Sequence, residues 1–380
     1  MNSTSVHHDA FADGTIDPVV IVGGGPIGIE IAVALTRRGI ANTIIEAGSV
    51  GHTISWWAPQ TRWFSSNERI AIAGVPLVTV DGSKATREEY LAYLRGVVRQ
   101  FDLSIATHTI ATDVTPQPGG GLAVRLRTTA GNRTIDASAV VLAIGGTDHP
   151  RRIDIPGTDR PHVDGYLREV HRYFGRRVLV VGGRNSAIEA ALRLYHVGAD
   201  VTLSYRGEEL PEDHIKYWLL PEIKGLMKVG KIRGEFGTNP VEILDSTVRL
   251  QRGEDTFLVD ADDVLLLIGY EQDKGLLRRS GVNLIESMQR PRHDPDTMMT
   301  DIDGVYVAGT AVAGTQSSKY KTFLENCHVH ADRIVNHLDA RLSRSSRDNP
   351  PGTLDRRSPE PPADSARDTF EKLIQIQPES

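Results

Sequence analysis

The chain has 380 residues, of which 39% are hydrophobic and 24% are charged, and its formal net charge is −6. Because a single hydrophobic core stops growing near about 250–300 residues, this length predicts two domains. A mildly acidic chain lacks the electrostatic footprint of a nucleic-acid-binding protein, and no apolar run approaches the ~20 residues of a membrane helix. The first residues also lack the apolar centre of a signal peptide, so we expect a cytoplasmic protein.

Composition changes at both ends of the chain. We expect residues 1–17 to form a disordered leader and residues 339–380 to form a largely disordered tail. The stretch 343–368 is rich in Pro, Ser, Arg and Asp, and it cannot bury enough apolar surface to offset its ordering entropy. The last segment, ARDTFEKLIQI, allows one short amphipathic helix, which is either a loose end or a docking segment.

Between these ends, short Val/Ile/Leu runs alternate with helical patterns. Continuous apolar runs are typical of strands that are buried on both faces of a parallel sheet. This alternation predicts an α/β fold with strands at 18–22, 42–46, 139–144, 177–181, 200–205, 263–268 and 304–308.

The first strand leads into a complete GxGxxG motif on Gly23, Gly25 and Gly28. In such a loop the first glycine permits a tight turn, the second lets a pyrophosphate approach the backbone, and the third lets helix and strand pack closely. The next strand ends in Glu46, eighteen residues after Gly28, where an acid accepts hydrogen bonds from a ribose. Strand, helix, second strand and acid together predict a dinucleotide site.

A second unit repeats this pattern in a degraded form. Gly182 opens its loop, but Arg184 stands in place of the middle glycine and Ala187 in place of the third. No acid ends the second strand, and Arg206 lies there instead. An arginine in place of the acid favours a ribose 2′-phosphate, and therefore NADPH over NADH. The alternative interpretation is that Arg206 is a solvated residue at the end of a strand. Two sites in one chain suit a retained FAD and a consumed NADPH, with hydride transfer between them.

Further segments resemble those of thioredoxin-reductase-like flavoproteins: an ATG-like strand, an IPG turn, a returning strand and an AGD-like ending, at 139–145, 155–157, 264–270 and 300–309. Within that group the likeness is greatest to YpdA-type bacillithiol-disulfide reductases, in the stretches 60–66, 182–187, 205–207 and 325–326. The resemblance spans residues 18–338.

This resemblance implies two Rossmann-like dinucleotide-binding domains and a homodimer. The NADPH domain (151–262) would be inserted into the FAD domain (18–150 and 263–338). The positions expected to hold FAD are Gly23, Gly24, Gly25, Pro26, Gly28, Glu46, Gly145, Gly309 and Thr310. Those expected to hold NADPH are Gly182, Gly183, Arg184, Asn185, Ser186, Arg206 and Gly269.

The sequence departs from these families at the positions that matter for thiol chemistry. Ile27 stands where family members carry a cysteine in the first glycine loop, and Thr310 replaces the aspartate of the AGD ending. The only cysteine is Cys327, which excludes a CxxC pair and agrees with a reducing compartment. Cys327 is a weak catalytic candidate beside His328, or simply a small buried residue, so the catalytic residue is unknown.

Two further groups of residues leave more than one interpretation open. His328 and His330 lie two apart and point in different directions on a helix, so we predict no metal site. Aromatic side chains cluster at 56–64, where they form either a wall against the flavin ring or ordinary core or dimer packing. These aromatic residues are Trp56, Trp57, Trp63 and Phe64.

The sequence therefore predicts an FAD-dependent oxidoreductase that takes hydride from NADPH and passes electrons to a small-molecule or small-protein acceptor. A disulfide-type acceptor, in the YpdA manner, is our main prediction. A cysteine-independent flavin reductase for a ferredoxin-like carrier is the first alternative. A redox sensor that binds nucleotides without turnover is the second, motivated by Arg184 in the degraded loop. Monooxygenation is a minor further option.

Overall fold

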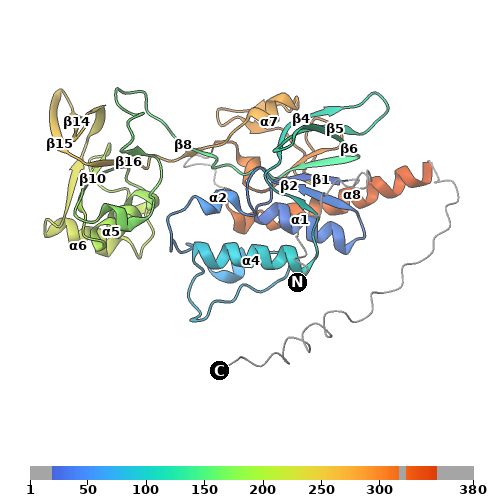
Figure 1. The fold of residues 1–380 in the computed structure, drawn as a ribbon, viewed down its shortest axis with the longest axis horizontal. Coiled ribbons are helices and arrows are strands. Elements are labelled where there is room, and N and C mark those ends of the chain that lie inside the picture. Colours follow the sequence, from blue (N-terminus) through green and yellow to red (C-terminus); the bar gives the residue numbers. More distant parts are fainter. Residues whose placement is uncertain (1–18, 316–321, 349–380) are drawn as a thin grey trace. The chain divides into compact units, whose positions relative to one another are not determined.

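The computed structural model describes residues 19–315 and 322–348 (Figure 1). The expected leader and the ARDTFEKLIQI segment lie outside these residues. No helix in the described ranges has the length and apolar character needed to span a membrane.

The first sheet has five parallel strands in the order β20-β7-β1-β2-β3. These strands are β1 (Val19–Val22), β2 (Asn42–Ile45), β3 (Ile105–Ala106), β7 (Ala139–Leu142) and β20 (Val305–Val307). Helix α1 (Pro26–Arg37) packs on β1 and β2, and it also contacts α4 (Arg87–Gln100). Helix α4 starts at a capping box, in which the Thr86 hydroxyl accepts from Glu89 N–H and the Glu89 carboxylate accepts from Thr86 N–H.

The second sheet is also parallel and five-stranded, in the order β12-β11-β10-β16-β9. Its strands are β9 (Val163–Asp164), β10 (Arg177–Val181), β11 (Asp200–Tyr205), β12 (Ile232–Phe236) and β16 (Asp263–Leu266). Val178 and Val180 pack with the helices α5 (Asn185–His196) and α6 (Leu220–Lys228). Leu179 and Val181 face the opposite side of the sheet. Both faces are therefore buried, which explains why the strand reads as a continuous apolar run.

Each sheet carries a three-stranded antiparallel meander inserted in the chain between two of its parallel strands, between β3 and β7 in the first sheet and between β12 and β16 in the second. The first consists of β4 (Ile110–Pro116), β5 (Leu122–Thr128) and β6 (Gly131–Ala137), and the second of β13 (Asn239–Ile243), β14 (Thr247–Arg252) and β15 (Asp255–Asp260). Each meander packs on one face of its sheet, and the helix that follows the glycine loop packs on the other face. The internal repeat thus covers whole domains and confirms the predicted α/β class.

The remaining elements are short or terminal. The helices are α2 (His52–Ser55), α3 (Asn67–Ile70), α7 (Gly275–Arg279) and α8 (His328–Asp348), with 3-10 turns at Val170–Tyr173, Glu212–His214, Gly309–Ala313 and Leu324–Asn326. Strand β8 (His149–Pro150) pairs antiparallel with β17 (Tyr270–Glu271), and β18 (Leu284–Ile285) pairs with β19 (Arg290–Pro291). The chain therefore leaves the first sheet and returns to it through the β8–β17 pair.

One expected boundary was wrong. Strand β16 pairs with β10 and β9, so residues 263–266 belong to the second sheet rather than to the returning part of the FAD domain. A short apolar strand that is buried on both faces is compatible with either sheet, so composition alone does not assign residues 263–266 to one of them. Helix α8 continues to Asp348, into the first part of the stretch 339–380, and the rest of that stretch lies outside the described residues. Extending an existing helix needs no new nucleus, so weakly apolar residues can follow it.

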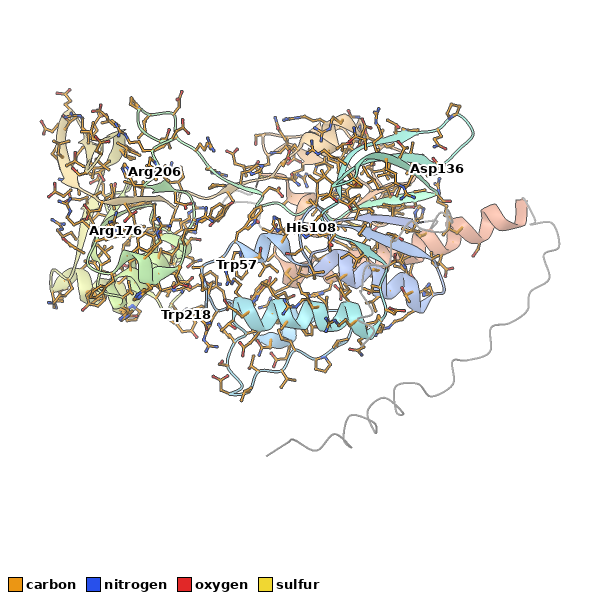
Figure 2. The ribbon with its side chains drawn as sticks, in the orientation of Figure 1. Trp57, His108, Asp136, Arg176, Arg206 and Trp218 are labelled. Carbon is orange, nitrogen blue, oxygen red and sulfur yellow. The ribbon has the colours of Figure 1, made fainter. Side chains whose placement is uncertain are left out.

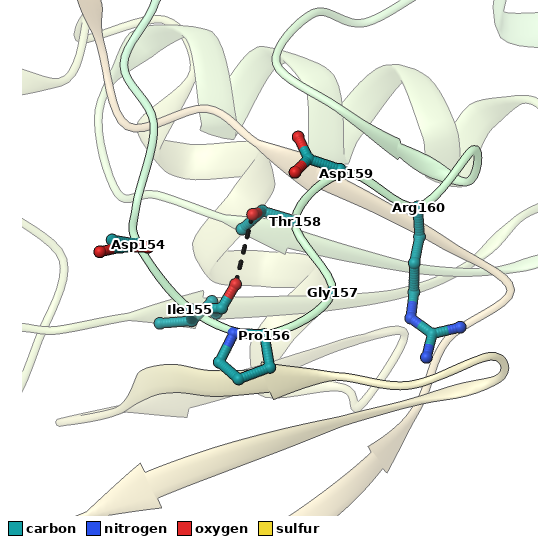
Figure 3. A pocket seen from close by; sticks show the side chains of 7 residues that line it. All are labelled: Asp154, Ile155, Pro156, Gly157, Thr158, Asp159 and Arg160. Carbon is teal, nitrogen blue, oxygen red and sulfur yellow. Dashed lines mark hydrogen bonds between the residues drawn. The ribbon is translucent and has the colours of Figure 1, made fainter.

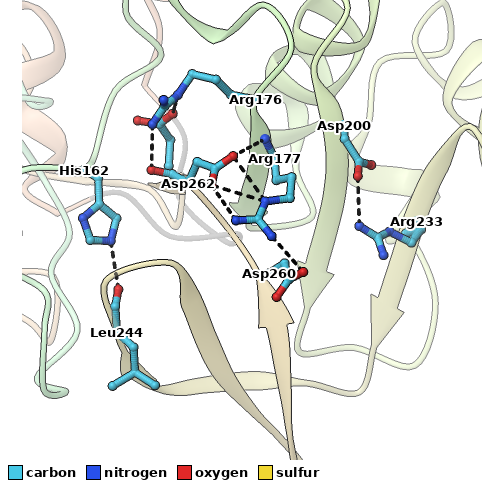
Figure 4. A network of polar contacts seen from close by, with 9 residues as sticks. His162, Arg176, Arg177, Asp200, Arg233, Leu244, Asp260 and Asp262 are labelled. Carbon is cyan, nitrogen blue, oxygen red and sulfur yellow. Dashed lines mark hydrogen bonds and ion pairs between the residues drawn. The ribbon is translucent and has the colours of Figure 1, made fainter.

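A polar network fixes β10 to β16 at the start of both strands (Figure 4). The Arg177 guanidinium donates to the Asp262 carboxylate at 2.6 Å, and Arg177 N–H donates to the same group at 2.9 Å. The Arg176 guanidinium forms a second ion pair, with the Asp263 carboxylate at 2.5 Å. The hydrogen bonds from Arg177 lower the pKa of Asp262 to about 2, so this carboxylate is ionised throughout the neutral range.

Candidate functional site

The first glycine loop has the backbone geometry that its sequence predicts. Gly23 has φ +116°, and a Cβ there would lie 2.3 Å from the Ala143 carbonyl oxygen. A Cβ on Gly28 would lie 2.0 Å from the Gly23 oxygen, so both positions require glycine. A Cβ on Gly25 would meet no atom within 4 Å. The middle of the loop therefore faces open space, as a backbone that receives a pyrophosphate must.

Glu46 lies against this loop with its carboxylate buried. One oxygen accepts from Gly24 N–H at 2.6 Å and the other accepts from Gly48 N–H at 2.7 Å. Two backbone donors hold the charge in one place. Glu46 thus stands at the end of β2, where an acid that receives a ribose is expected.

The other expected FAD positions gather at the carboxyl ends of β7 and β20. Gly145 has φ +81° and open space at its Cβ position, and a Cβ on its neighbour Gly146 would lie 2.9 Å from the Thr310 oxygen. Gly309 has φ +68°, and a Cβ there would lie 3.4 Å from the Cβ of Ile27. Because β7, β1 and β20 are adjacent or nearly adjacent strands, these segments form one edge with the first loop. The open positions in the two loops fit FAD.

A buried histidine supports the far end of this edge. Gly309 N–H donates to His330 Nδ1 at 3.1 Å. Burial lowers the pKa of His330 to about 4, so the ring is neutral and its Nδ1 is free of a proton to accept this bond. His330 was not predicted as a site residue, because the sequence gives no signal for a contact between segments so far apart.

The second loop keeps the geometry of the first but changes its side chains. Gly182 has φ +144°, and a Cβ there would lie 2.5 Å from the Leu267 oxygen. A Cβ on Gly183 would lie 2.4 Å from the Tyr205 ring. Gly24 has Glu46 in the corresponding place, so Tyr205 takes the position of the acid.

The expected NADPH residues line the start of α5. Arg184 is its N-cap and is exposed, as are Ser186 and Arg206. The side chain of Asn185 is already engaged, since its oxygen accepts from Lys216 N–H at 2.8 Å. Lys216 was not predicted, and this bond brings the segment that carries it to the helix start. Gly269 follows β16 with φ +108°.

Cys327 is fully buried immediately before α8. Its thiol donates to the Phe323 carbonyl at 3.0 Å. Burial, reinforced by Glu325 and Glu30, raises the pKa of the thiol to about 12. A thiol of this kind stays protonated at neutral pH, so the structure favours the packing interpretation over the catalytic one.

The aromatic cluster at 56–64 divides into two groups. Trp57 packs on Trp63, with ring centroids 4.8 Å apart, and Trp63 packs on Tyr90 at 4.5 Å. Trp56 and Phe64 instead contact Tyr166 and Trp218, which belong to the domain of the second sheet. Figure 2 labels Trp57 of the first domain and Trp218 of the second. Trp57 and Trp63 are half-buried and pack toward the buried ring of Tyr90, so both interpretations of this group stay open.

Neither of two surface hollows coincides with the glycine loops. An open hollow of about 700 Å³ lies along residues 154–160, where the Thr158 hydroxyl donates to the Ile155 oxygen at 3.2 Å (Figure 3). A smaller one of about 330 Å³ has Pro150, Tyr166 and Leu266 in its wall. Within the described ranges, no three His, Cys, Asp or Glu side chains gather as metal ligands would.

Comparison with known proteins gives matches over most of the chain. A relative named Bacilliredoxin reductase Bdr, from Bacillus subtilis (strain 168), is 33% identical over 320 residues, which cover 84% of this chain and 96% of the relative. Ferredoxin--NADP reductase 2 from Bacillus mycoides (strain KBAB4) is 25% identical over 305 residues, covering 77% and 84%. The solved structure of Bacillithiol Disulfide Reductase Bdr (YpdA) from Bacillus cereus matches with a TM-score of 0.81 at 33% identity, over 86% of this chain and 100% of that one.

The family described as Pyridine nucleotide-disulphide oxidoreductase matches residues 20–309, which include both glycine loops. These matches confirm the predicted resemblance to YpdA-type reductases. The chain therefore belongs to the pyridine nucleotide-disulphide oxidoreductase family, is an enzyme, and uses FAD and NAD(P)H as cofactors.

Proposed function

We propose that this chain is an NADPH-dependent reductase of a low-molecular-weight disulfide, with bacillithiol disulfide as the first substrate to test. The observation that carries the proposal is the pair of dinucleotide loops in two equivalent sheets, one with Glu46 and the other with Arg206 at its strand end. The names of the relatives at 33% identity, a bacilliredoxin reductase and a bacillithiol disulfide reductase, support a disulfide as the acceptor.

The residues of the first loop would bind and orient FAD, which when bound accepts a hydride and passes its electrons on. Glu46 would receive the ribose, and the N–H groups at the start of α1 would face the pyrophosphate. Gly145, Gly309 and Thr310 would border the far end. The neutral His330 ring keeps Gly309 N–H bonded and so fixes that loop.

The second loop would bind NADPH in preference to NADH. Arg206 and Arg184 are both exposed near the start of α5, where a guanidinium can reach a phosphate. Tyr205 in place of an acid removes the carboxylate that would repel a 2′-phosphate. These side chains, together with the N-terminal end of the helix dipole, supply positive potential for an anionic nucleotide.

No thiol of this chain is placed to attack the acceptor. Ile27 occupies the loop position next to Gly309, and Cys327 is buried and protonated at neutral pH. We therefore propose that the acceptor disulfide receives its electrons without a mixed disulfide to this protein. We further propose that the protein is a cytoplasmic homodimer. We also propose that FAD and NADPH bind to separate domains, and that the NADPH domain ends after Leu266 instead of at residue 262.

The test is the visible absorption spectrum of the purified protein before and after anaerobic NADPH. A flavin band that NADPH bleaches faster than NADH, and that bacillithiol disulfide restores, supports the proposal. Restoration by a ferredoxin but not by disulfides would replace it with the ferredoxin reductase alternative, which a 25% identical relative illustrates. A band that never bleaches would support the sensor alternative. Size-exclusion chromatography with light scattering tests the homodimer.

A further inference from the structure

A single arginine of the second sheet's domain is bonded to a loop of the first. Arg193 lies on α5, and its Nη1 donates to the Thr61 hydroxyl at 2.7 Å. Its Nη2 donates to the Pro59 carbonyl. The two acceptors lie between α2 and α3, and Thr61 belongs to the stretch 60–66 of this chain that resembles YpdA-type reductases. The contact thus joins the helix of the expected NADPH loop to the expected FAD domain.

This contact is built into a half-buried environment. Burial lowers the pKa of Arg193, and burial raises the pKa of Glu189, which lies one turn earlier on the same helix. Glu189 and Arg193 are opposite charges four residues apart, so each partly offsets the desolvation of the other. A desolvated guanidinium is stable only when its donors are bonded, and the two acceptors at Pro59 and Thr61 provide this.

The loop that receives Arg193 is itself held in place by α4. The Arg87 guanidinium donates to the carbonyls of Trp57 at 2.6 Å and Ser55 at 3.2 Å. Gln60 N–H donates to the Glu88 carboxylate at 3.2 Å. Helix α4 therefore holds one side of this loop, and Arg193 adds the bonds at Pro59 and Thr61.

Two aromatic contacts flank the Arg193 bond. The rings of Trp56 and Tyr166 have centroids 5.9 Å apart, and those of Phe64 and Trp218 are 6.1 Å apart. The Lys84 ammonium lies 4.0 Å from the Trp218 ring centroid and donates to the Phe64 carbonyl at 2.7 Å. The segment 56–64 thus meets the second domain through these ring contacts and through Arg193, whose contact is made by directional hydrogen bonds.

The N-terminus of the same helix, α5, follows the second glycine loop, where the nucleotide is expected to bind. Residue 193 lies eight positions after the start of α5 at Asn185, about 12 Å along the axis at 1.5 Å per residue. A helix of this length is rigid, so bonds at Arg193 orient the axis whose N-terminus faces the expected pyrophosphate. Asn185 also fixes Lys216, two residues before Trp218. A change in the orientation of α5 at Arg193 therefore also changes the position of the nucleotide loop at the start of the helix.

We propose that Arg193 is a positioning residue for hydride delivery: by bonding Pro59 and Thr61 it sets the orientation of α5, and with it the nicotinamide nucleotide, relative to the flavin site. The inference rests on the proposed function, because it assigns NADPH to the α5 loop. Arg193 itself touches neither cofactor position. It acts through the helix, which distinguishes it from Arg184 and Arg206.

The test compares Arg193→Ala, Arg193→Lys and the control Arg233→Ala in the FAD-loaded protein. Arg233 is an exposed arginine of the same sheet, paired with Asp200 at 3.4 Å. Stopped-flow absorption gives the limiting rate of flavin reduction and the NADPH concentration at half that rate. We expect Arg193→Ala to lower the limiting rate about 10- to 100-fold, the cost of an ångström-scale misplacement. The half-saturating concentration should change far less, with partial rescue in Arg193→Lys and no effect in Arg233→Ala.

A second readout does not depend on turnover. Amide hydrogen exchange of the loop around Thr61 should rise in Arg193→Ala without a change in the flavin absorption spectrum. Wild-type reduction rates together with unchanged exchange would overturn the inference. If Arg193→Ala does not fold, Thr61→Val, which removes one acceptor, decides it by the same two readouts. If NADPH fails to reduce the wild-type flavin, the proposed function is wrong, and the exchange measurement still tests the contact.

Discussion

The single thiol gives the sharpest test of how electrons leave this enzyme. We predict that Cys327→Ser retains NADPH-dependent disulfide reduction at close to the wild-type rate. The side chain is fully buried, and its thiol donates to the Phe323 carbonyl. A serine hydroxyl can make the same bond, so we expect a loss of about 1 kcal/mol in the free energy of unfolding, from the smaller apolar volume.

The magnitude of the chemical effect follows from the pKa of about 12, compared with the ordinary value of 9.0. At neutral pH the thiolate fraction is then about 1,000-fold smaller than that of an unperturbed thiol, and alkylation slows by at least as much. Iodoacetamide labelling of the native and the urea-unfolded protein, followed by mass spectrometry, measures this ratio. Labelling of the native protein within minutes, accompanied by loss of disulfide reduction, would refute the reasoning and restore Cys327 as a catalytic candidate.

Three further predictions concern the cofactor loops and the packing of α8. Arg206→Ala should raise the KM for NADPH about 10- to 100-fold and leave the KM for NADH nearly unchanged, because a charged hydrogen bond to phosphate contributes about 1.5–3 kcal/mol; steady-state kinetics with both nucleotides measures the difference. Gly23→Ala should purify with little FAD, since its Cβ would lie 2.3 Å from the Ala143 oxygen at a positive φ, and equal flavin absorbance per chain would contradict this. The Glu30 carboxylate, 2.8 Å from His328, raises the pKa of that histidine above its ordinary value. The resulting stability is complete below about pH 6.5 and is lost as the pH rises through the raised pKa, so urea unfolding between about pH 6 and pH 9 should show a larger loss in the wild type than in Glu30→Gln.

The sequence predicted those parts of the fold whose signal is local. Strands β10 and β11 have the predicted bounds, because each begins at a charged residue and ends where its Val/Leu pattern stops. The meanders were missed although β5 alternates buried Leu122, Val124 and Leu126 with less buried residues. That period of two predicts a half-buried strand by itself, whereas our prediction relied on continuous runs alone.

The site was predictable only where one short motif contains it. The glycine loops and Glu46 lie within single βαβ units, so spacing alone locates them. His330 and Arg193 act on Gly309, Pro59 and Thr61 through contacts that span many residues, up to 134 in the chain. No local pattern distinguishes these side chains from an ordinary buried histidine or a helix-surface arginine. Their roles depend on how the two sheets are connected, which only the folded chain reveals.

The two halves of the repeat differ in a way that suits their two cofactors. The first site places its selective side chain, Glu46, in a buried position with both oxygens bonded to backbone donors. The second site places Arg184 and Arg206 in exposed positions. A ligand that contacts a preorganised buried group dissociates slowly, whereas one that contacts exposed arginines competes with water and salt and exchanges readily. We infer that one backbone unit serves both a retained and a consumed nucleotide because the burial of a few side chains differs, without any change in topology.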